Sequence, residues 1–203
     1  LGISIIFTLI NYFLIVVGVL IFHAAFTYSL LLTSLAKINP FIFFSKMKEA
    51  IIFAFSTSSS SATMPVTLKT VEEKLGVDKS VSSFCIPLGT TINMDGTAIM
   101  QGVATVFIAQ VYQVDLSMME YLMVIITATL ASIGTDGVPG VGLIMLAMVL
   151  QQVGLPVEGI ALIIGVDRLL DMLRTAVNVS GDATISCIVA NSENQISRKD
   201  FIS

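Results

Sequence analysis

The chain has 203 residues, of which 55% are hydrophobic and only 12% are charged, and its formal net charge is −4. Soluble domains carry about 25% charged residues, so this composition excludes an ordinary soluble protein and indicates a polytopic membrane protein. The acidic balance gives no reason to expect a nucleic-acid partner. Cys85 and Cys187 form no disulfide or metal pattern, and we expect both to be small buried residues.

The first element is an apolar run at residues 3–35, long enough to span a bilayer and too long for a signal-peptide core. Because the chain opens at Leu1 rather than Met, we expect a fragment whose upstream part is missing. The single histidine, His23, lies in this run, and we expect it to be a packing or interfacial residue.

Two later regions are apolar, break, and become apolar again. Residues 41–76 break at the serine-rich stretch 56–65, and residues 117–154 break at the glycine-rich stretch 132–140. Each half has only about 12 to 17 residues, which is short for a span and typical of a re-entrant hairpin. The second tip suits a mobile lid over a ligand, with a plain turn as the alternative.

Lysines flank the first hairpin on both sides, whereas no lysine or arginine flanks the second. Positive charge close to apolar segments marks the cytoplasmic side, so the first hairpin should enter from the cytoplasm and the second from outside. The tail at 192–203, which holds Arg198 and Lys199, should be cytoplasmic.

The two remaining spans carry polar residues. Residues 79–112 are interrupted at Asn93-Met94-Asp95, and residues 156–191 carry a polar stripe. Irregular backbone at membrane depth needs protein or a polar cavity around it. The predicted fold is therefore an all-α membrane protein with three spanning helices and two oppositely oriented re-entrant hairpins, which form an inverted repeat. Shared membrane composition is the alternative explanation for the repetition.

The stripe occupies an arc of roughly 100° on the last span at about 100° of rotation per residue. Each ionised aspartate near the bilayer centre costs on the order of 2.5 to 3.5 kcal/mol, so the stripe needs partners. Its members are Asp167, Asp171, Arg174, Thr175, Asn178 and Asp182.

Two kinds of ligand fit these residues. The planar fork of Arg174 suits a carboxylate and Asp171 suits an ammonium group, although a structural ion pair between the two is an alternative. The serine run 58–61 opens a half-helix whose positive end favours a second carboxylate, unless it serves close helix packing.

The second kind of ligand that these residues suit is a small hard cation. Four carboxylates face one arginine, a net charge of minus three that requires cations or protons. Hard oxygen ligands suit sodium, with Met94 either part of the site or an apolar filler. The candidate ligands are Asn93, Asp95, Asn178, Asp182 and the carbonyls of Gly89 and Thr91.

Taken together, these motifs strongly resemble the dicarboxylate/amino acid:cation symporters, which include the excitatory glutamate transporters and archaeal sodium-coupled aspartate transporters. The resemblance covers about residues 3–195 and rests on the motifs at 58–65, 93–97, 132–140 and 171–182.

The resemblance implies roles for individual residues. Asp171 would hold the ammonium group, Arg174 the side-chain carboxylate, and Ser60 with Asn178 the main carboxylate, with Asp167 in support. Further substrate contacts would come from Ser58, Ser59, Thr97, Val138, Gly142 and Thr175. One sodium ion would use Gly89, Asn93, Asn178 and Asp182; a second Thr91, Ser132, Ile133 and Thr135; and a third Asn93 and Asp95, with Met94 beside them.

The resemblance also implies a homotrimer in which a transport domain slides like an elevator past a scaffold. This chain would be most of that transport domain, without one earlier helix and without the scaffold. Two departures from the family pattern matter. One is the absence of a second arginine that some members carry, because its two possible positions are Ser58 and Met172 here. The other is the acid Asp136 at the second tip.

The predicted function is sodium-coupled uptake of L-aspartate or L-glutamate across the plasma or inner membrane by a multi-pass carrier. The protein should not be an enzyme, and its co-transported sodium ions need no organic cofactor. Proton-coupled uptake of an acidic amino acid or a dicarboxylate is the alternative within the family. An intramembrane aspartyl protease using Asp95 and Asp182 and an anion channel lined by the hairpins are the alternatives from other classes.

Overall fold

The computed structural model describes residues 2–197, and their side chains from residue 7 onward. Within this range the regular structure is helical apart from one isolated antiparallel bridge, Val77 to Ile196, so the predicted all-α class is confirmed there. Arg198 and Lys199 of the predicted tail lie outside the described residues. The elements are α1 (Gly2–Phe22), η1 (His23–Tyr28), α2 (Ser29–Leu31), η2 (Leu32–Ala36), α3 (Pro40–Thr57), α4 (Ser60–Glu73), α5 (Lys79–Ile92), α6 (Asp95–Val111), α7 (Met118–Ile133), α8 (Val141–Gln152), η3 (Val157–Gly159) and α9 (Ile160–Ser192).

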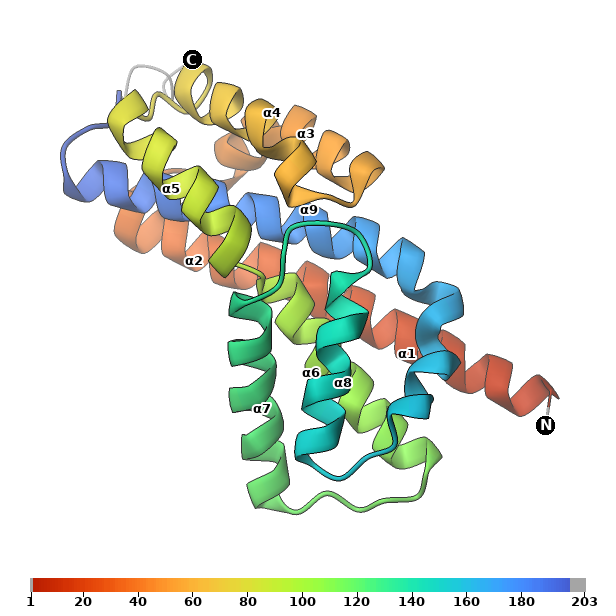
Figure 1. The fold of residues 1–203 in the computed structure, drawn as a ribbon. Coiled ribbons are helices and arrows are strands. Elements are labelled where there is room, and N and C mark those ends of the chain that lie inside the picture. Colours follow the sequence, from red (N-terminus) through yellow and green to blue (C-terminus); the bar gives the residue numbers. More distant parts are fainter. Residues whose placement is uncertain (1, 198–203) are drawn as a thin grey trace.

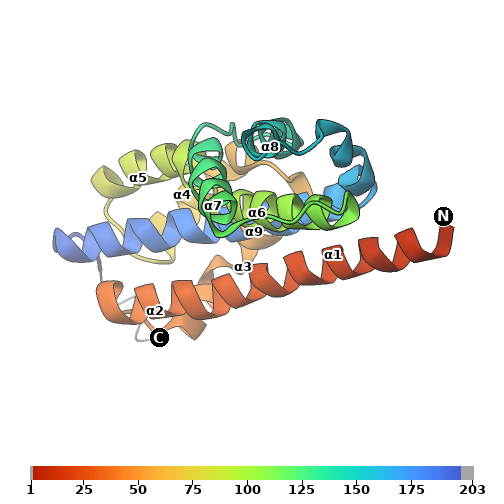
Figure 2. The same ribbon diagram turned by 90° about the horizontal axis from the view of Figure 1, so that it is seen from below.

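The segments α1, η1, α2 and η2 follow one another without a break and form one long rod on the outside of the molecule (Figure 2). Two stretches of the rod, η1 and η2, have π-helical hydrogen bonding. Among the described residues, 7–36 form the one helix that is long and apolar enough to cross a membrane by length and composition, and 17% of its most apolar window is buried. The rod ends where Lys37 adopts a left-handed φ of 57°.

Two pairs of shorter helices follow the pattern expected of the hairpins. Helix α3 ends at Ser58, which has a φ of 51°, and α4 begins after Ser59, whose side chain accepts the Ala62 N–H as an N-cap. The second pair, α7 and α8, packs side by side and is joined by a loop that ends at Gly140, with a φ of 83° (Figure 1).

The helix break predicted near residue 93 separates α5 from α6. Asn93 and Met94 leave the helical conformation, and Asp95 begins the next helix. The Asn93 N–H still donates to the carbonyl of Gly89 at 2.7 Å, which closes the last turn of α5.

Helix α9 is the central element, with 33 residues. It packs against α1, α3, α4, α5, α6 and α8 and lies between the rod and the paired helices (Figures 1 and 2). Two apolar clusters cover its two ends, one with α6, α7 and α8 and the other with α3, α4 and α5. Cys85 and Cys187 are free and buried, as expected.

The segment that follows α9 is fastened to the loop between α4 and α5. The Asp78 N–H donates to the Gln195 carbonyl at 2.9 Å, and the Ser197 N–H donates to the Gly76 carbonyl at 2.7 Å. These bonds flank the bridge from Val77 to Ile196. The end of α9 and the start of α5 are thereby held together.

Close packing at Gly159 gives a test of the fold. A Cβ atom there would lie 2.5 Å from Cγ2 of Ile108, so Gly159→Ala should lower the free energy of unfolding by about 1–3 kcal/mol. Gly102→Ala, which has nothing within 4 Å, should be neutral or stabilise α6 by up to about 1 kcal/mol. Unfolding titrations of the purified protein in detergent measure both. Equal stability of the two variants would contradict the packing.

Candidate functional site

Arg174 lies at the centre of the polar face of α9. Its side chain is 1% exposed and donates through one terminal nitrogen to Asp167 Oδ1 and through the other to Asp171 Oδ1, both at 2.8 Å. The ion pair between Arg174 and Asp171 that the sequence left as an alternative is therefore present, and Arg174 forms a second ion pair with Asp167. Because two carboxylates face one guanidinium, this group keeps a net charge of minus one when all three are ionised.

The loops of the two helical pairs meet over this face (Figure 1). The carbonyl of Gly137 accepts the Ser59 hydroxyl at 2.7 Å and the Ser61 N–H at 3.1 Å. The Gly140 N–H donates to Asp171 Oδ2 at 3.2 Å. Both tips therefore touch the residues predicted to hold a substrate.

Other predicted substrate residues surround Arg174. A Cβ atom at Gly142 would lie 3.2 Å from Cγ2 of Thr97 and 3.6 Å from a terminal nitrogen of Arg174. Ser58, Ser60 and Thr175 are also buried, whereas Val138 is 45% exposed. Two buried polar atoms, Ser58 Oγ and Arg174 Nε, have no hydrogen-bond partner among the described residues. They remain available to an anionic ligand.

The predicted ion residues gather one turn further along α9. Asn93 Nδ2 donates to Asp182 Oδ1 at 2.8 Å, and Asn178 Oδ1 accepts the Gly96 N–H at 2.8 Å. Asn178 Nδ2 lies 3.1 Å from the Met94 sulfur, so Met94 contacts the predicted site rather than filling remote space. A Cβ atom at Gly89 would lie 2.5 Å from Asp182 Oδ1. Glycine thus allows α5 to approach the carboxylate.

Asp95 makes contacts that the sequence analysis missed. Its Oδ2 lies 2.9 Å from His23 Nε2 and accepts the Tyr28 hydroxyl at 2.8 Å. His23 packs with its ring against a carboxylate 72 residues away, a specific contact that its place in an apolar run did not predict. An aspartyl protease needs its two aspartates hydrogen-bonded to each other. Here Asp95 bonds Tyr28 and Asp182 bonds Asn93, and the two carboxylates do not bond each other.

The predicted second sodium site joins the ends of two helices. Thr91 lies in the last turn of α5 and Ile133 is the last residue of α7, two helices in contact. The hydroxyls of Thr91, Ser132 and Thr135 donate their hydrogens to carbonyls of nearby turns, which leaves the oxygen lone pairs for a cation. The C-terminal ends of α5 and α7 also present their last carbonyl groups to a cation, at the negative end of each helix dipole.

The signals for the missed residues differ. Gly96 belongs to the motif at 93–97, and its close approach to Arg174 and Asn178 follows the rule that glycine admits another backbone. Gln101, whose Nε2 donates to the Gly142 carbonyl at 3.3 Å, had no signal beyond a polar residue in an apolar run. The contact of Tyr28 had no sequence signal.

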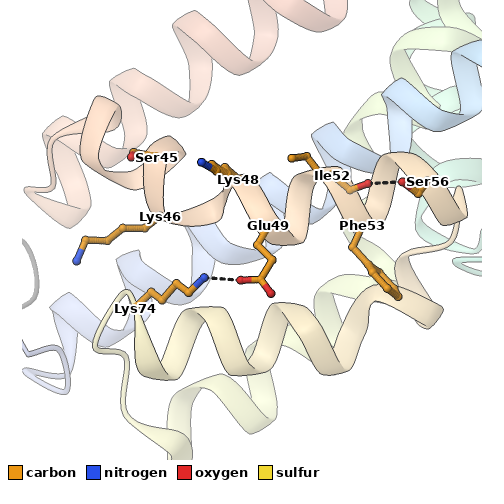
Figure 3. A pocket seen from close by; sticks show the side chains of 8 residues that line it. All are labelled: Ser45, Lys46, Lys48, Glu49, Ile52, Phe53, Ser56 and Lys74. Carbon is orange, nitrogen blue, oxygen red and sulfur yellow. Dashed lines mark hydrogen bonds and ion pairs between the residues drawn. The ribbon is translucent and has the colours of Figure 1, made fainter.

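A separate hollow of about 700 Å³ opens between α3 and α4 (Figure 3). Its polar lining includes Lys46, Lys48 and an ion pair between Lys74 and Glu49. None of its lining residues belongs to the predicted substrate or sodium sites, so we do not assign the site to it.

Comparison with known proteins shows the family of the chain. Residues 1–192 match the model of the sodium:dicarboxylate symporter family, and the chain belongs to this family. It is 46% identical over 187 residues to excitatory amino acid transporter 1 of Rattus norvegicus, covering 92% of this chain and 34% of the relative.

Other relatives give the same picture. An excitatory amino acid transporter of Caenorhabditis elegans is 47% identical over 88% of this chain and 35% of its own length. Excitatory amino acid transporter 3 of Oryctolagus cuniculus is 46% identical over 94% of this chain and 36% of its own length. The chain thus spans about a third of the length of these relatives. The family and the relatives are transporters and not enzymes, which leaves the protease alternative without support.

The buried position of Arg174 predicts a stability effect. Arg174→Met leaves Asp167 and Asp171 without their cation and should lower the free energy of unfolding by about 3–5 kcal/mol, the usual cost of breaking a buried pair. Arg168→Met, at an exposed position of α9, should change it by less than about 0.5 kcal/mol. A detergent titration of the purified variants measures both. Similar losses in the two variants would refute the burial argument.

Proposed function

We propose that the protein is a secondary transporter that couples the uptake of L-aspartate or L-glutamate to sodium. The observation that carries the proposal is Arg174, buried beside Asp171 at the meeting point of two helical-pair tips. A guanidinium in this position suits the side-chain carboxylate of the substrate, and Asp171 suits its ammonium group. Ser58, Ser59, Ser60 and Asn178 would hold the main carboxylate, with Thr97, Val138, Gly142 and Thr175 lining the pocket.

The membrane arrangement belongs to the proposal. Residues 3–35 form a spanning helix, 41–76 and 117–154 form re-entrant hairpins, and 79–112 and 156–191 form the broken and the polar-striped spans. The hairpins enter from opposite sides as an inverted repeat, with the C-terminus in the cytoplasm. The pairing of α3 with α4 and of α7 with α8, each with a tip against α9, supports this topology.

Helix dipoles explain how one site can hold opposite charges. Helices α4 and α8 begin at the predicted substrate pocket, where their positive ends favour carboxylates. Helices α5 and α7 end near the predicted second sodium site, where their last carbonyls favour cations. Sodium would also be held by Gly89, Asn93, Asn178 and Asp182, and by Asn93 and Asp95 with Met94 adjacent.

We further propose that the complete protein is a homotrimer in the plasma or inner membrane, in which the transport domain moves as an elevator past a scaffold. The relatives are named excitatory amino acid transporters, which supports an amino acid as substrate. The family name supports sodium as the coupling ion and leaves room for a dicarboxylate substrate. Proton coupling is the alternative, since protonated carboxylates would also relieve the excess negative charge.

The proposal predicts that an inward sodium gradient drives uptake. Proteoliposomes of the full-length protein should accumulate radiolabelled aspartate when sodium is imposed outside, because the excess carboxylates of the site need cations before an acidic substrate can bind. A proton gradient without sodium is the control. Accumulation that follows the proton gradient and ignores sodium would establish the alternative.

Substrate selectivity depends on Arg174 in this proposal. Arg174→Cys should raise the KM for aspartate by a factor of about 100 or more, since a charge-assisted bidentate contact is lost, and should admit small neutral amino acids. The KM is measured from the uptake of labelled aspartate. The gain of neutral substrates is measured from competition by serine and from the uptake of labelled serine. Arg168→Cys is the matched control, because Arg168 is exposed on the same helix. An unchanged aspartate KM in Arg174→Cys would refute the role.

Sodium affinity should depend on the space at Gly89. Gly89→Ala places a Cβ atom 2.5 Å from Asp182 Oδ1 and should displace that carboxylate, raising the sodium concentration for half-maximal uptake about ten-fold. Gly165→Ala, with nothing within 4 Å, should leave it unchanged. Sodium titrations of uptake at saturating aspartate distinguish the two. An unaltered sodium dependence in Gly89→Ala would remove Asp182 from the ion site.

A further inference from the structure

The outer rod of the molecule reaches the candidate ion site at one place, the π-helical segment η1. This segment begins at His23 and ends at Tyr28, and both side chains contact Oδ2 of Asp95, at 2.9 and 2.8 Å. Nothing in the roles described above uses either residue.

The π-helical geometry explains why these two side chains act together. In an α-helix, residues five apart point about 140° away from each other. The wider winding of a π-helix, with hydrogen bonds from i to i+5, reduces this angle and brings the two side chains toward the same face. The rings of His23 and Tyr28 accordingly lie edge to face, with centroids 4.8 Å apart. The irregular turn therefore places two hydrogen-bond donors on one face of the rod.

Both donors bond the same oxygen of Asp95, Oδ2, and neither bonds Oδ1. A carboxylate only accepts, so Nε2 of His23 carries the hydrogen of their contact. No donor from the described residues is bonded to Asp95 Oδ1. Because both bonds converge on Oδ2, the carboxylate has a defined orientation with one oxygen open to a cation.

Tyr28 extends this arrangement to α9. Its side chain is 2% exposed, and its hydroxyl lies 3.1 Å from the carbonyl of Val177, the residue before Asn178. A Cβ atom at Gly181 would lie 2.7 Å from the Tyr28 hydroxyl and 2.5 Å from Asn93 Nδ2. The hydroxyl thus sits among Asn93, Asp95 and α9, where the candidate ion ligands gather.

We propose that Tyr28 and His23 are positioning residues for sodium binding, which orient the Asp95 carboxylate through its Oδ2 atom and so raise the affinity of the ion site. The inference rests on the proposed sodium coupling and deepens it. The π-helical turn η1 then contributes to ion binding in addition to being part of a helix long enough to cross a membrane.

The test compares two tyrosines of the same rod in the full-length protein. Tyr28→Phe removes the hydroxyl that bonds Asp95, whereas Tyr12→Phe removes one that is equally buried and has no hydrogen-bond partner among the described residues. Sodium titrations of aspartate uptake in proteoliposomes should show a half-maximal sodium concentration raised about ten-fold in Tyr28→Phe and changed less than about two-fold in Tyr12→Phe. The KM for aspartate at saturating sodium should change less than two-fold in both.

A second pair of variants guards against a purely structural effect. His23→Gln keeps an N–H donor and should retain sodium affinity close to that of the wild type, whereas His23→Leu should raise the half-maximal sodium concentration as Tyr28→Phe does. If Tyr28→Phe does not fold, this pair decides. A normal sodium dependence in Tyr28→Phe or His23→Leu, or equal shifts in the two tyrosine variants, would overturn the inference. Sodium-independent uptake by the wild type would instead overturn the proposed function itself.

Discussion

The structure depends on one constraint: the backbone groups freed where helices break must find polar partners inside the protein. The polar face of α9 supplies several of them. Asn178 accepts the N–H of Gly96 at the start of α6, and Asp171 accepts the N–H of Gly140 at the start of α8. The tips of the helical pairs also satisfy each other through the Gly137 carbonyl. The side chains that stabilise the breaks are therefore the same ones that are available to a ligand.

This double use links binding to local rearrangement. In the structure, Asp171 is bonded to both Arg174 and Gly140, so a substrate ammonium group would compete with a guanidinium and a backbone N–H for the same carboxylate. Likewise, a sodium ion at Asp182 would compete with the amide of Asn93. At Asp171 and Asp182 a ligand would thus replace internal bonds, which keeps the net gain in free energy from these two contacts modest.

Much of the fold was predictable because its signals are local. The break between α3 and α4, the break at Asn93 and the stripe on α9 each follow from residue types within a few positions of one another. The bond between Arg174 and Asp171 follows from their spacing of three on a helix. The helical class and the family were predicted on this basis and are confirmed, whereas the roles of the individual site residues stay predictions.

Contacts between distant segments were beyond sequence reasoning. Tyr28 and Asp95 are 67 positions apart, and their meeting depends on a π-helical turn that changes the rotation of the rod partway along it. A periodicity counted at a constant 100° per residue assigns His23 and Tyr28 to different faces, so it could not predict that both contact Asp95. The same holds for the contact of Ser59 with Gly137, 78 positions away, which depends on how two helical pairs dock.

The pairing of residues 195–197 with 76–78 has a mechanical consequence. It ties the far end of α9 to the loop between α4 and α5, so the first helical pair, α5 and α9 are joined at the same end of the molecule (Figure 1). The second helical pair is joined to the other end of α9 through the chain at 153–159, and its tip bonds Asp171 through the Gly140 N–H. A displacement of α9 along its axis would therefore act on both helical pairs, through the pairing of residues 195–197 with 76–78 at one end and through the chain at 153–159 at the other.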